Sequence, residues 1–480
     1  MRKIYIASLL AGLALASTSC DDFLTEMPEN SYTLENSVTD YSTAKNAVNG
    51  IYGVYVSSTN LGGYLFSNVH CMAGIWDYTP DMYNMGYTQS NPGYTIPSTW
   101  SDLYETINAA NAAIQGIEKL NDDLFPSAQE KQRLIAEARC FRGYCYLNLM
   151  WYFAHWFDNA DSPYGLIYRD KTSELSNLMV DRLKVGESYD LIIDDLKAGE
   201  ESLGDYRSGK YLSKQFAQAM HAKLLMVRNW PGDYEEALGL VNAIFATAPS
   251  NFQMESDITE LYSKGWDSNE VLFSRYLGDY SSITQREFVY SYGLWYSNTF
   301  NDVVQGWLEA DGRFPLITGE ARSPETWQDQ RKEKVLTKLY HRGRVEGMND
   351  MYASYNFRYA ELYLMKAELM VRTNPANLEA AIAEVNKMRQ SYTNPVLEPL
   401  SGISTVAEFM DALYKEYVVT LLMENETPWF ASLRFEHDGK PWIYTLKPDV
   451  NFTQNQFCWP IPDDEIIAHL NKIEQNPGLE

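Results

Sequence analysis

Cysteine and histidine are scarce in this chain, which has 480 residues but only five cysteines and six histidines. So few cysteines cannot form the disulfide framework that holds small secreted domains together. The sequence has no CxxC pair and no cluster of histidines, so we expect no zinc site. Cys140 and Cys145 lie in a stretch with a helical pattern, about 140° apart around the helix axis. We therefore expect them not to form a disulfide.

Signatures of common enzyme classes are also missing. The sequence contains no GxSxG elbow, no HExxH pair, no P-loop and no glycine pattern of a dinucleotide-binding turn. We therefore expect a protein without catalytic activity and without a cofactor. Glycoside hydrolysis needs only two carboxylates about 5–9 Å apart. Because the chain has 64 acidic residues, a surface glycoside hydrolase is the enzyme alternative.

Positive charge is in deficit. Lysine and arginine total 39 against 64 aspartates and glutamates, which gives a formal net charge of −25 at pH 7. A body this acidic repels nucleic acid and anionic lipid headgroups. It suits neutral or cationic ligands better than polyanions, although the same charge also serves solubility. With 45% hydrophobic and 14% aromatic residues, the chain is expected to fold.

Long hydrophobic runs are absent except at the N-terminus. There Arg2 and Lys3 precede an apolar run, Ile4 to Ala16, which is followed by small residues and then Cys20. This arrangement is typical of a secretory signal peptide, here residues 1–19. The run is shorter than the ~20 residues that a transmembrane helix needs. No later stretch approaches ~18 apolar residues, so we expect no membrane-spanning helix in the rest of the chain.

Cleavage after residue 19 would make Cys20 the first residue of the mature chain. The pattern resembles a bacterial lipoprotein signal, in which that cysteine is acylated, although Ser17 stands where such signals usually carry leucine. Each buried CH₂ of an acyl chain contributes about 0.8 kcal/mol, so several chains anchor a protein firmly. We predict that Cys20 is the lipid anchor and that residues 20–40 form an extended tether. The alternative is an ordinary signal peptide that ends near a cysteine.

Helical periodicity predicts a mostly α-helical body after the tether. Apolar residues at three- and four-residue steps predict helices within 41–58 and 99–155. The segments 213–248 and 356–390 each have the pattern of a helix pair of about 34–36 residues, which is the size of a tetratricopeptide-type hairpin. A long stretch of chain separates the two pairs, so they form no continuous solenoid in sequence order. They could still stack in space.

Two regions have a different composition, because glycine, proline and aromatic residues gather there. Residues 61–98 and 250–345 are predicted to be loop-rich. The first contains I-W-D-Y-T-P-D-M-Y-N-M-G-Y at 75–87, and the second contains F-V-Y-S-Y-G-L-W-Y-S-N-T-F at 288–300. Near the C-terminus, two prolines exclude a continuous helix around 460–462.

Several stretches together resemble the SusD/RagB family of outer-membrane nutrient-binding lipoproteins. They occur in the family's order along nearly the whole chain. They are C-D-D-F-L-T-E-M-P at the mature start, W-S-D-L-Y-E-T-I-N-A-A-N, A-E-A-R-C-F-R-G-Y-C-Y, R-Y-A-E-L-Y-L-M-K-A-E-L at 358–369, W-P-I-P-D-D-E-I at 459–466 and Q-N-P-G at 475–478. Each stretch is a weak signal alone, and their shared order makes the resemblance specific.

One segment departs from the family pattern. Members often carry a stretch near E-R-R-x-E-L-x-x-E-G-x-R-W-F-D-L-x-R, whereas this chain has L-L-M-E-N-E-T-P-W-F-A-S-L-R. The residues that keep the pattern are Glu424, Trp429, Phe430, Leu433 and Arg434. The resemblance therefore leaves the local packing of this segment open.

The resemblance implies a single body over residues 41–480, including a C-terminal region over about 400–480. Four tetratricopeptide-like hairpins would form one side, and the other side would be irregular and bind the ligand. The family's proteins are non-catalytic, face the exterior of the outer membrane and bind oligosaccharides, or in some branches peptides. Their partner is a SusC-like TonB-dependent transporter, which receives the nutrient. A tetratricopeptide-type scaffold that binds only a protein partner is the alternative.

A sugar ring has apolar faces and a hydroxyl edge, so it binds well to a flat aromatic ring with hydrogen-bonding side chains beside it. Both aromatic-rich stretches have that composition. In the predicted site, aromatic rings stack on sugar and carboxylates accept hydrogen bonds. Its candidates are Trp76, Asp77, Asp81, Tyr83, Tyr87, Trp295 and Tyr296. The alternative is that the aromatic residues form the core of a loop-rich region.

Overall fold

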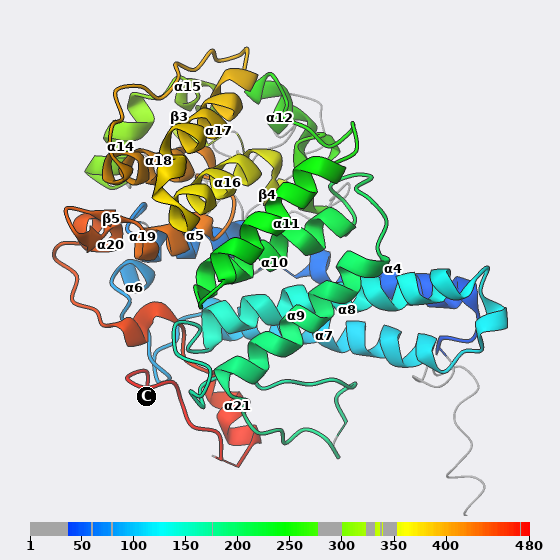
Figure 1. The fold of residues 1–480 in the computed structure, drawn as a ribbon. Coiled ribbons are helices and arrows are strands. Elements are labelled where there is room, and N and C mark those ends of the chain that lie inside the picture. Colours follow the sequence, from blue (N-terminus) through cyan, green and yellow to red (C-terminus); the bar gives the residue numbers. More distant parts are fainter. Residues whose placement is uncertain are drawn as a thin grey trace, which may run out of the picture.

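The computed structural model describes residues 37–58, 61–77, 80–174, 176–276, 300–322, 332–336, 338, 353–470 and 472–480. Over these residues the chain is mostly helical, as predicted (Figure 1). The α-helices are α4 (Tyr41–Ser57), α5 (Gly63–Met72), α6 (Pro80–Tyr83), α7 (Thr95–Glu118), α8 (Ala128–Phe153), α9 (Val185–Ser202), α10 (Lys214–Arg228), α11 (Asp233–Thr247), α12 (Ile258–Lys264), α14 (Asp302–Glu309), α15 (Phe314–Ile317), α16 (Tyr359–Thr373), α17 (Leu378–Ser391), α18 (Val406–Thr420), α19 (Thr427–Arg434), α20 (Trp442–Leu446) and α21 (Asp463–Ala468).

Short 3₁₀ helices and small sheets join these helices. The 3₁₀ helices are η1 (Asp122–Leu124), η2 (Gly265–Asp267), η4 (Pro375–Asn377) and η5 (Gln454–Phe457). The strands pair as antiparallel two-stranded sheets, which are β1 (Val271–Tyr276) with β4 (Ala353–Arg358), β2 (Thr318–Arg322) with β3 (Lys332–Leu336), and β5 (Glu436–His437) with β6 (Lys440–Pro441). The strands are short, so helix packing forms most of the core.

The long helices pack in chain order into one scaffold. α4 lies on α7, α7 on α8, α8 on α9 and α9 on α10. α10 and α11 form the first predicted helix pair, and α16 and α17 form the second. α11 packs against α16, so the two pairs stack in space although they are distant in the sequence. Figure 1 shows α4, α7 and α8 at one side of the molecule and α16 to α18 at another.

Side-chain caps and a left-handed residue set the ends of several helices. The hydroxyl of Ser213 accepts a hydrogen bond from the backbone N–H of Phe216 at 3.2 Å and so caps α10. Thr405 and Glu408 form a capping box at the start of α18. Such caps are worth about 1 kcal/mol each. α10 ends where Asn229 adopts the left-handed conformation, with φ of 53°.

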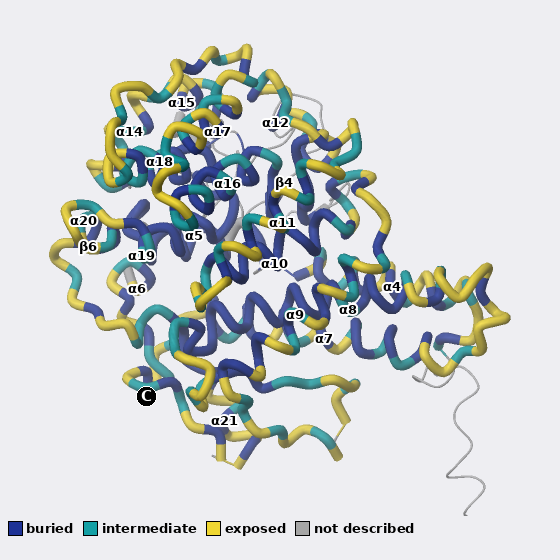
Figure 2. The backbone as a smooth tube through the Cα atoms, in the orientation of Figure 1, coloured by how far each residue is buried: buried dark blue, intermediate teal, exposed yellow. Residues whose placement is uncertain are grey.

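The last turns of α8 lie in the centre of the core, and the C-terminal segment closes over them. Figure 2 shows α8 buried along most of its length. Trp459 stacks on Tyr152, with ring centroids 5.0 Å apart and an interplanar angle of 20°. The side-chain amide of Asn476 donates to the backbone carbonyls of Phe153 and Trp459, at 3.0 and 2.9 Å. The C-terminal motif is therefore a structural clamp on α8.

Residues 61–98 are less irregular than the sequence predicted. They contain the ten-residue helix α5, and α7 already begins at Thr95. Gly62 precedes α5 with φ of 101°, and Gly74 follows it with φ of 74°. Pro97 lies in the first turn of α7, where a missing N–H leaves no hydrogen bond unmade. The glycines and this proline therefore mark helix ends rather than one long loop. Helix α9 was also not predicted from the sequence.

The described cysteines behave as buried core residues. Cys71, Cys140, Cys145 and Cys458 are free and buried, and the prediction that Cys140 and Cys145 do not pair is confirmed. Among the residues with assigned structure, no group of three or more His, Cys, Asp or Glu is arranged to hold a metal ion. Within the same ranges, no helix is long and apolar enough to cross a membrane. Cys20 and nearly all of the predicted tether lie outside the described residues.

The segment that departs from the family pattern is firmly packed. Glu424 and Trp429 are fully buried, and Phe430 is 2% exposed. The guanidinium of Arg434 donates to both carboxylate oxygens of Glu368, at 2.7 and 2.9 Å. The residues that keep the pattern make core and ion-pair contacts, and so do departing residues such as Glu426, which pairs with Lys223. The packing that the sequence left open is therefore tight along the whole segment.

Candidate ligand-binding site

The chain turns sharply after α5, and this turn places the first predicted ligand residues. Gly74 has φ of 74°, a conformation that glycine adopts without steric cost. A Cβ at this position would lie 2.5 Å from Cγ of Lys447 and 3.0 Å from Cβ of Leu446. Glycine therefore lets the turn lie directly against the end of α20. Trp76 and Asp77 follow the turn and so lie beside the C-terminal region.

The chain that follows the second aromatic-rich stretch joins the same turn. Phe300 forms an antiparallel β-bridge with Trp76, and the backbone N–H of Asn301 donates to the carbonyl of Ile75 at 3.1 Å. The side-chain amide of Asn301 donates to the carbonyl of Leu446 at 2.7 Å. Asn301 thus connects segments that are far apart in the sequence: the turn after α5, the start of α14 and the end of α20.

Tyr83, on the short helix α6, is half-buried beside this junction. The ammonium of Lys447 lies 5.2 Å from the ring centroid of Tyr83 and 5.3 Å from that of Phe452. Burial raises the pKa of the Tyr83 hydroxyl, and the charges of Asp77 and Asp449 raise it further. The aromatic ring therefore has a cation against it and two carboxylates near its hydroxyl.

Lys447 is the buried cation of this region. Lys447 is 1% exposed, and its ammonium donates a hydrogen bond to the backbone carbonyl of Met72 at 3.1 Å. Burial lowers the pKa of Lys447 to about 7, although the nearby Cys71 and Asp77 oppose the shift. The charge that contacts Tyr83 therefore titrates close to neutral pH.

The outer side of the junction carries exposed polar and aromatic groups. Asp77 and Asp81 are exposed, and Tyr444 is 45% exposed. Tyr444 stacks on Phe452, with centroids 5.1 Å apart and an interplanar angle of 16°, which fixes the orientation of its ring. Figure 1 shows α5 and α6 next to α19 and α20. We name this group the α6 corner, and it comprises Asp77, Asp81, Tyr83, Asn301, Tyr444, Lys447, Asp449 and Phe452.

The structure corrects the prediction for Trp76 and Tyr87. Each is 1% exposed. The hydroxyl of Tyr87 donates to the backbone carbonyl of Gln456 at 2.6 Å, and Trp76 is held in the core beside Phe300. Neither ring has a free face for a sugar. For these two residues, the alternative given by the sequence, that they belong to the core, is the one that the structure supports.

The other predicted ligand residues divide into two groups. Asp77, Asp81 and Tyr83 reach the surface, lie in the α6 corner and stay predicted ligand residues. Trp295 and Tyr296 lie outside the described residues. Phe300, which ends the same aromatic-rich stretch, is described and lies beside Trp76.

Sequence reasoning missed Asn301, Tyr444, Lys447 and Phe452. Their contribution depends on contacts with α6 and with the turn after α5, which are distant in the sequence. Only Tyr444 carried a local signal, because it is an aromatic residue outside the buried face of α20.

A buried ionic cluster supports the α5 side of the corner. Glu424 accepts hydrogen bonds from Nε of Arg358 at 2.6 Å and from Nζ of Lys338 at 3.0 Å. The backbone N–H of Met423 donates to Nε2 of His70, on α5, at 2.9 Å. The turn that carries Glu424 is therefore bonded directly to the helix that leads into the site.

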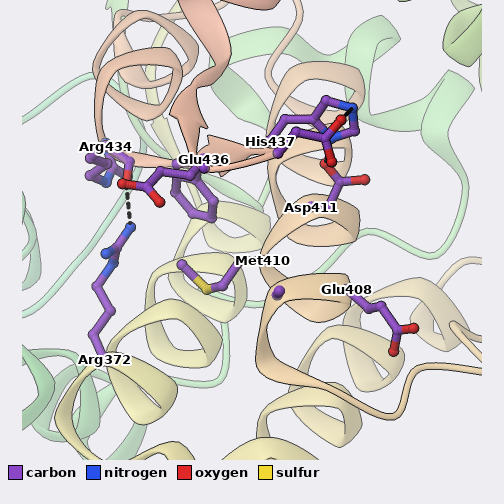
Figure 3. A pocket seen from close by; sticks show the side chains of 11 residues that line it. Arg372, Glu408, Met410, Asp411, Arg434, Glu436 and His437 are labelled. Atoms are coloured by element: carbon purple, nitrogen blue, oxygen red, sulfur yellow. Dashed lines mark hydrogen bonds and ion pairs between the residues drawn. The ribbon is translucent and has the colours of Figure 1, made fainter.

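A separate hollow of about 620 Å³ lies among the end of α16, the start of α18 and the β5–β6 turn (Figure 3). Several of its charged groups bind one another or the backbone: Arg372 donates to the carbonyl of Arg434 at 3.1 Å, and Asp411 contacts Nδ1 of His437 at 2.8 Å. The ring of Phe435 is 1% exposed. The other ring in the lining, that of His437, stacks on Trp442, and no tyrosine or tryptophan among the described residues lines the hollow, so we assign the candidate site to the α6 corner.

Two family models match the chain, each over a different part. A model described as starch-binding associating with outer membrane matches residues 22–226. A model described as the SusD family matches residues 286–479. The first match includes α5 and α6, and the second includes α20, so both sides of the α6 corner lie within matched regions. No curated protein sequence matches the chain.

Solved structures share the fold over nearly the whole chain. A putative sugar binding protein from Bacteroides vulgatus has 21% identity and a TM-score of 0.68, with 93% of this chain and 100% of that chain covered. A laminarin-binding SusD-like protein has 18% identity and a TM-score of 0.68, with 92% and 100% covered. NanU of B. fragilis has 16% identity and a TM-score of 0.68, with 94% and 100% covered. At these identities the likeness establishes the fold.

Proposed function

We propose that this chain, which belongs to the SusD/RagB family, captures oligosaccharides at the cell surface and delivers them to a SusC-like TonB-dependent transporter in the outer membrane. The protein acts by binding and release, without catalysis. The observation that carries the proposal is the α6 corner. It combines exposed aromatic surface with carboxylates and an amide at a junction of distant segments.

The chemistry of the corner suits a neutral sugar. Tyr444 and Tyr83 offer ring surface for the apolar face of a pyranose, and their few rotatable bonds keep the entropic cost of binding low. Asp77 and Asp81 accept hydrogen bonds from sugar hydroxyls. The laminarin-binding neighbour and the starch-binding description of the first family model support a neutral glucan as the class to test first. A peptide is the second ligand class to test.

The proposed location follows from the N-terminus. A lipid on Cys20 would hold the body at the exterior face of the outer membrane through a tether. The tether keeps the binding protein near its transporter, and a high local concentration favours repeated capture and transfer. No membrane contact of the folded body is needed for this arrangement.

The test is calorimetric titration of the full-length protein with laminarin and starch oligosaccharides. The double variant Tyr83→Ala/Tyr444→Ala should bind more weakly by about 1–3 kcal/mol, roughly 5- to 150-fold, because two stacking surfaces are lost. Tyr94→Ala is the matched control, since Tyr94 is an exposed tyrosine, 70% exposed, outside the corner. It should bind within about twofold of the parent.

The outcomes separate the proposal from its alternatives. Equal binding by the parent and the double variant would remove the α6 corner as the site. A protein that captures its transporter but binds neither glycan nor peptide would be a scaffold. Recovery of shortened oligosaccharide after binding, lost when one carboxylate is removed, would identify a hydrolase.

A further inference from the structure

A second hollow with aromatic walls lies away from the α6 corner. It has a volume of about 350 Å³ and is bounded by α4, the turn before α10 and strand β1. Its walls include Asn49, Tyr52, Gly53, Val56 and Tyr211, and Phe273 lies in its lining. We name it the α4 groove. Figure 1 shows α4 on one side of the molecule and α6 on the other. Ligand pockets typically begin at about 300 Å³.

The aromatic walls of the groove are held in place. The hydroxyl of Tyr52 donates to Glu137 at 2.6 Å and accepts the backbone N–H of Leu212 at 2.9 Å. Tyr211 packs edge-on against Tyr52, with centroids 5.6 Å apart and an interplanar angle of 73°. Tyr211 is nevertheless 42% exposed. The guanidinium of Arg207 lies over the Tyr211 ring, 5.4 Å from its centroid, so the groove presents a partly exposed tyrosine ring that Tyr52 and Arg207 hold in place, and sugar stacking requires such a ring.

The cations that border the groove have partners within the protein. Lys210 pairs with Asp267 at 2.9 Å. The guanidinium of Arg275 donates to the carbonyls of Tyr55 and Val56, at the end of α4, where the helix dipole is negative. The groove thus offers stacking surface, an exposed amide from Asn49 and neutral hydrogen bonding rather than a charged binding site.

Gly53 keeps the groove open. It lies in the middle of α4, where glycine is the poorest helix former after proline. A Cβ at Gly53 would meet no atom within 4 Å, so the packing of the protein does not require glycine there. A larger side chain would instead project into the groove. Of the two glycines within α4, Gly50 and Gly53, only Gly53 lines the groove, and it leaves room there for an occupant.

We propose that the α4 groove is a second binding site, and that it takes one neutral sugar ring of a glycan. The ring stacks on Tyr211, and Asn49 hydrogen-bonds its hydroxyls. The class of ligand rests on the proposed function, whereas the position of the site rests on the groove itself. Two sites on separate sides of the body would bind a long polysaccharide at two points, which increases its residence time at the surface.

The experiment measures stoichiometry by calorimetry on the purified full-length protein, with laminarihexaose and maltohexaose as separate probes. The parent should bind two equivalents of at least one probe. Gly53→Leu fills the groove, and Tyr211→Ala removes its platform, so each should bind one. The double variant Tyr83→Ala/Tyr444→Ala should retain only the α4 groove. Gly50→Leu is the matched control, because Gly50 is on the same helix, has open space around it and does not line the groove.

Leucine is a better helix former than glycine, so neither glycine variant should lower the melting temperature. Two equivalents bound by Gly53→Leu would overturn the proposal. The proposal would also be overturned if the parent binds one equivalent and the variant Tyr83→Ala/Tyr444→Ala binds none, although the proposed function would then stand. If neither probe binds anywhere, both proposals fail for neutral glucans. If Gly53→Leu keeps its stoichiometry but no longer captures the transporter, the groove is a protein contact and the second sugar site is wrong.

Discussion

Replacing Glu424 by glutamine should destabilise the protein strongly, because this residue balances the charge of a buried cluster. Arg358 and Lys338 are the cations of the cluster, and Glu424 and Glu270 are its carboxylates. All four residues are at most 1% exposed. Tyr262 also donates to Glu424, at 2.7 Å. Glutamine keeps the shape of the side chain but leaves the two cations with a single carboxylate.

The size of the effect follows from the loss of one partner in a buried ion pair. Such a loss typically costs about 3–5 kcal/mol, compared with a total stability of about 5–15 kcal/mol for a folded domain. Lys338→Met in the Glu424→Gln background restores charge balance, because Arg358 and Glu270 remain paired. We expect Lys338→Met to cost about 1–3 kcal/mol less in that background than in the parent protein.

The effect should also depend on pH. Burial lowers the pKa of Lys338 to about 8, and the charge of Glu424 opposes that shift. Without Glu424 the pKa of Lys338 should fall further. Between its folded pKa and its ordinary value of 10.5, the unfolded chain binds more protons than the native one, so stability rises with pH. In Glu424→Gln this window extends to lower pH, so the variant should lose less stability at pH 9 than at pH 6.

Urea unfolding followed by circular dichroism, at pH 6 and pH 9, measures these quantities for the parent, both single variants and the double variant. The slope of the unfolding free energy against urea concentration should be the same in all four proteins, so that differences in the urea midpoint reflect differences in stability. A loss below about 1 kcal/mol for Glu424→Gln at pH 6 would refute the reasoning. If the stability loss of the double variant equals the sum of the losses in Glu424→Gln and Lys338→Met, the two residues are not coupled.

Other predictions concern the α6 corner and the anchor. Gly74→Ala should lower the free energy of unfolding by about 1–2 kcal/mol because of the positive φ, as thermal unfolding would show. It should also weaken glycan binding in calorimetry, because the new Cβ displaces Lys447. Unchanged binding would mean that the turn does not affect the site. Between pH 7 and 10.5, Lys447 should raise the free energy of unfolding of the parent by up to about 1.4 kcal/mol per pH unit. Lys447→Met should lack this contribution when stability is measured by urea unfolding across that pH range. The same dependence of stability on pH in both proteins would contradict the buried ammonium. Cys20→Ala should move the protein from the outer-membrane fraction to the soluble fraction; continued anchoring would rule out the lipid at this residue.

Periodicity and capping predicted much of the scaffold. The helix pairs around 213–248 and 356–390 form as expected. The apolar stripe of an amphipathic helix faces the core whichever helices pack against it, so the helix can be predicted without the tertiary structure. Residues 61–98 were predicted less well. Gly62, Gly74 and Pro97 are local signals of irregular backbone, but they lie at the ends of α5 and α7. These helices depend on burial, α5 against α19 and α7 against α4 and α8. The number of glycines and prolines in a segment does not show where helices begin or end beside them.

The candidate site was predictable only in part. Aromatic composition led to the segment that contains the candidate corner, and in it Asp77, Asp81 and Tyr83 do reach the surface. It did not distinguish them from Trp76 and Tyr87, because the same residue types fill cores and bind sugars. Burial alone separates the two groups, and burial is a property of the whole fold.

By itself, the sequence predicted a secretory signal, and it determined the acidic charge, the helical class and the family resemblance, since each depends on local pattern or on totals. The tertiary structure decided which aromatic rings are free, and it brought Asn301, Tyr444 and Lys447 to α6. It also lowered the pKa of Lys447 to about 7, because the fold removes the ammonium from water. Desolvation and long-range contact are set by neighbours in space, which the order of residues alone does not specify.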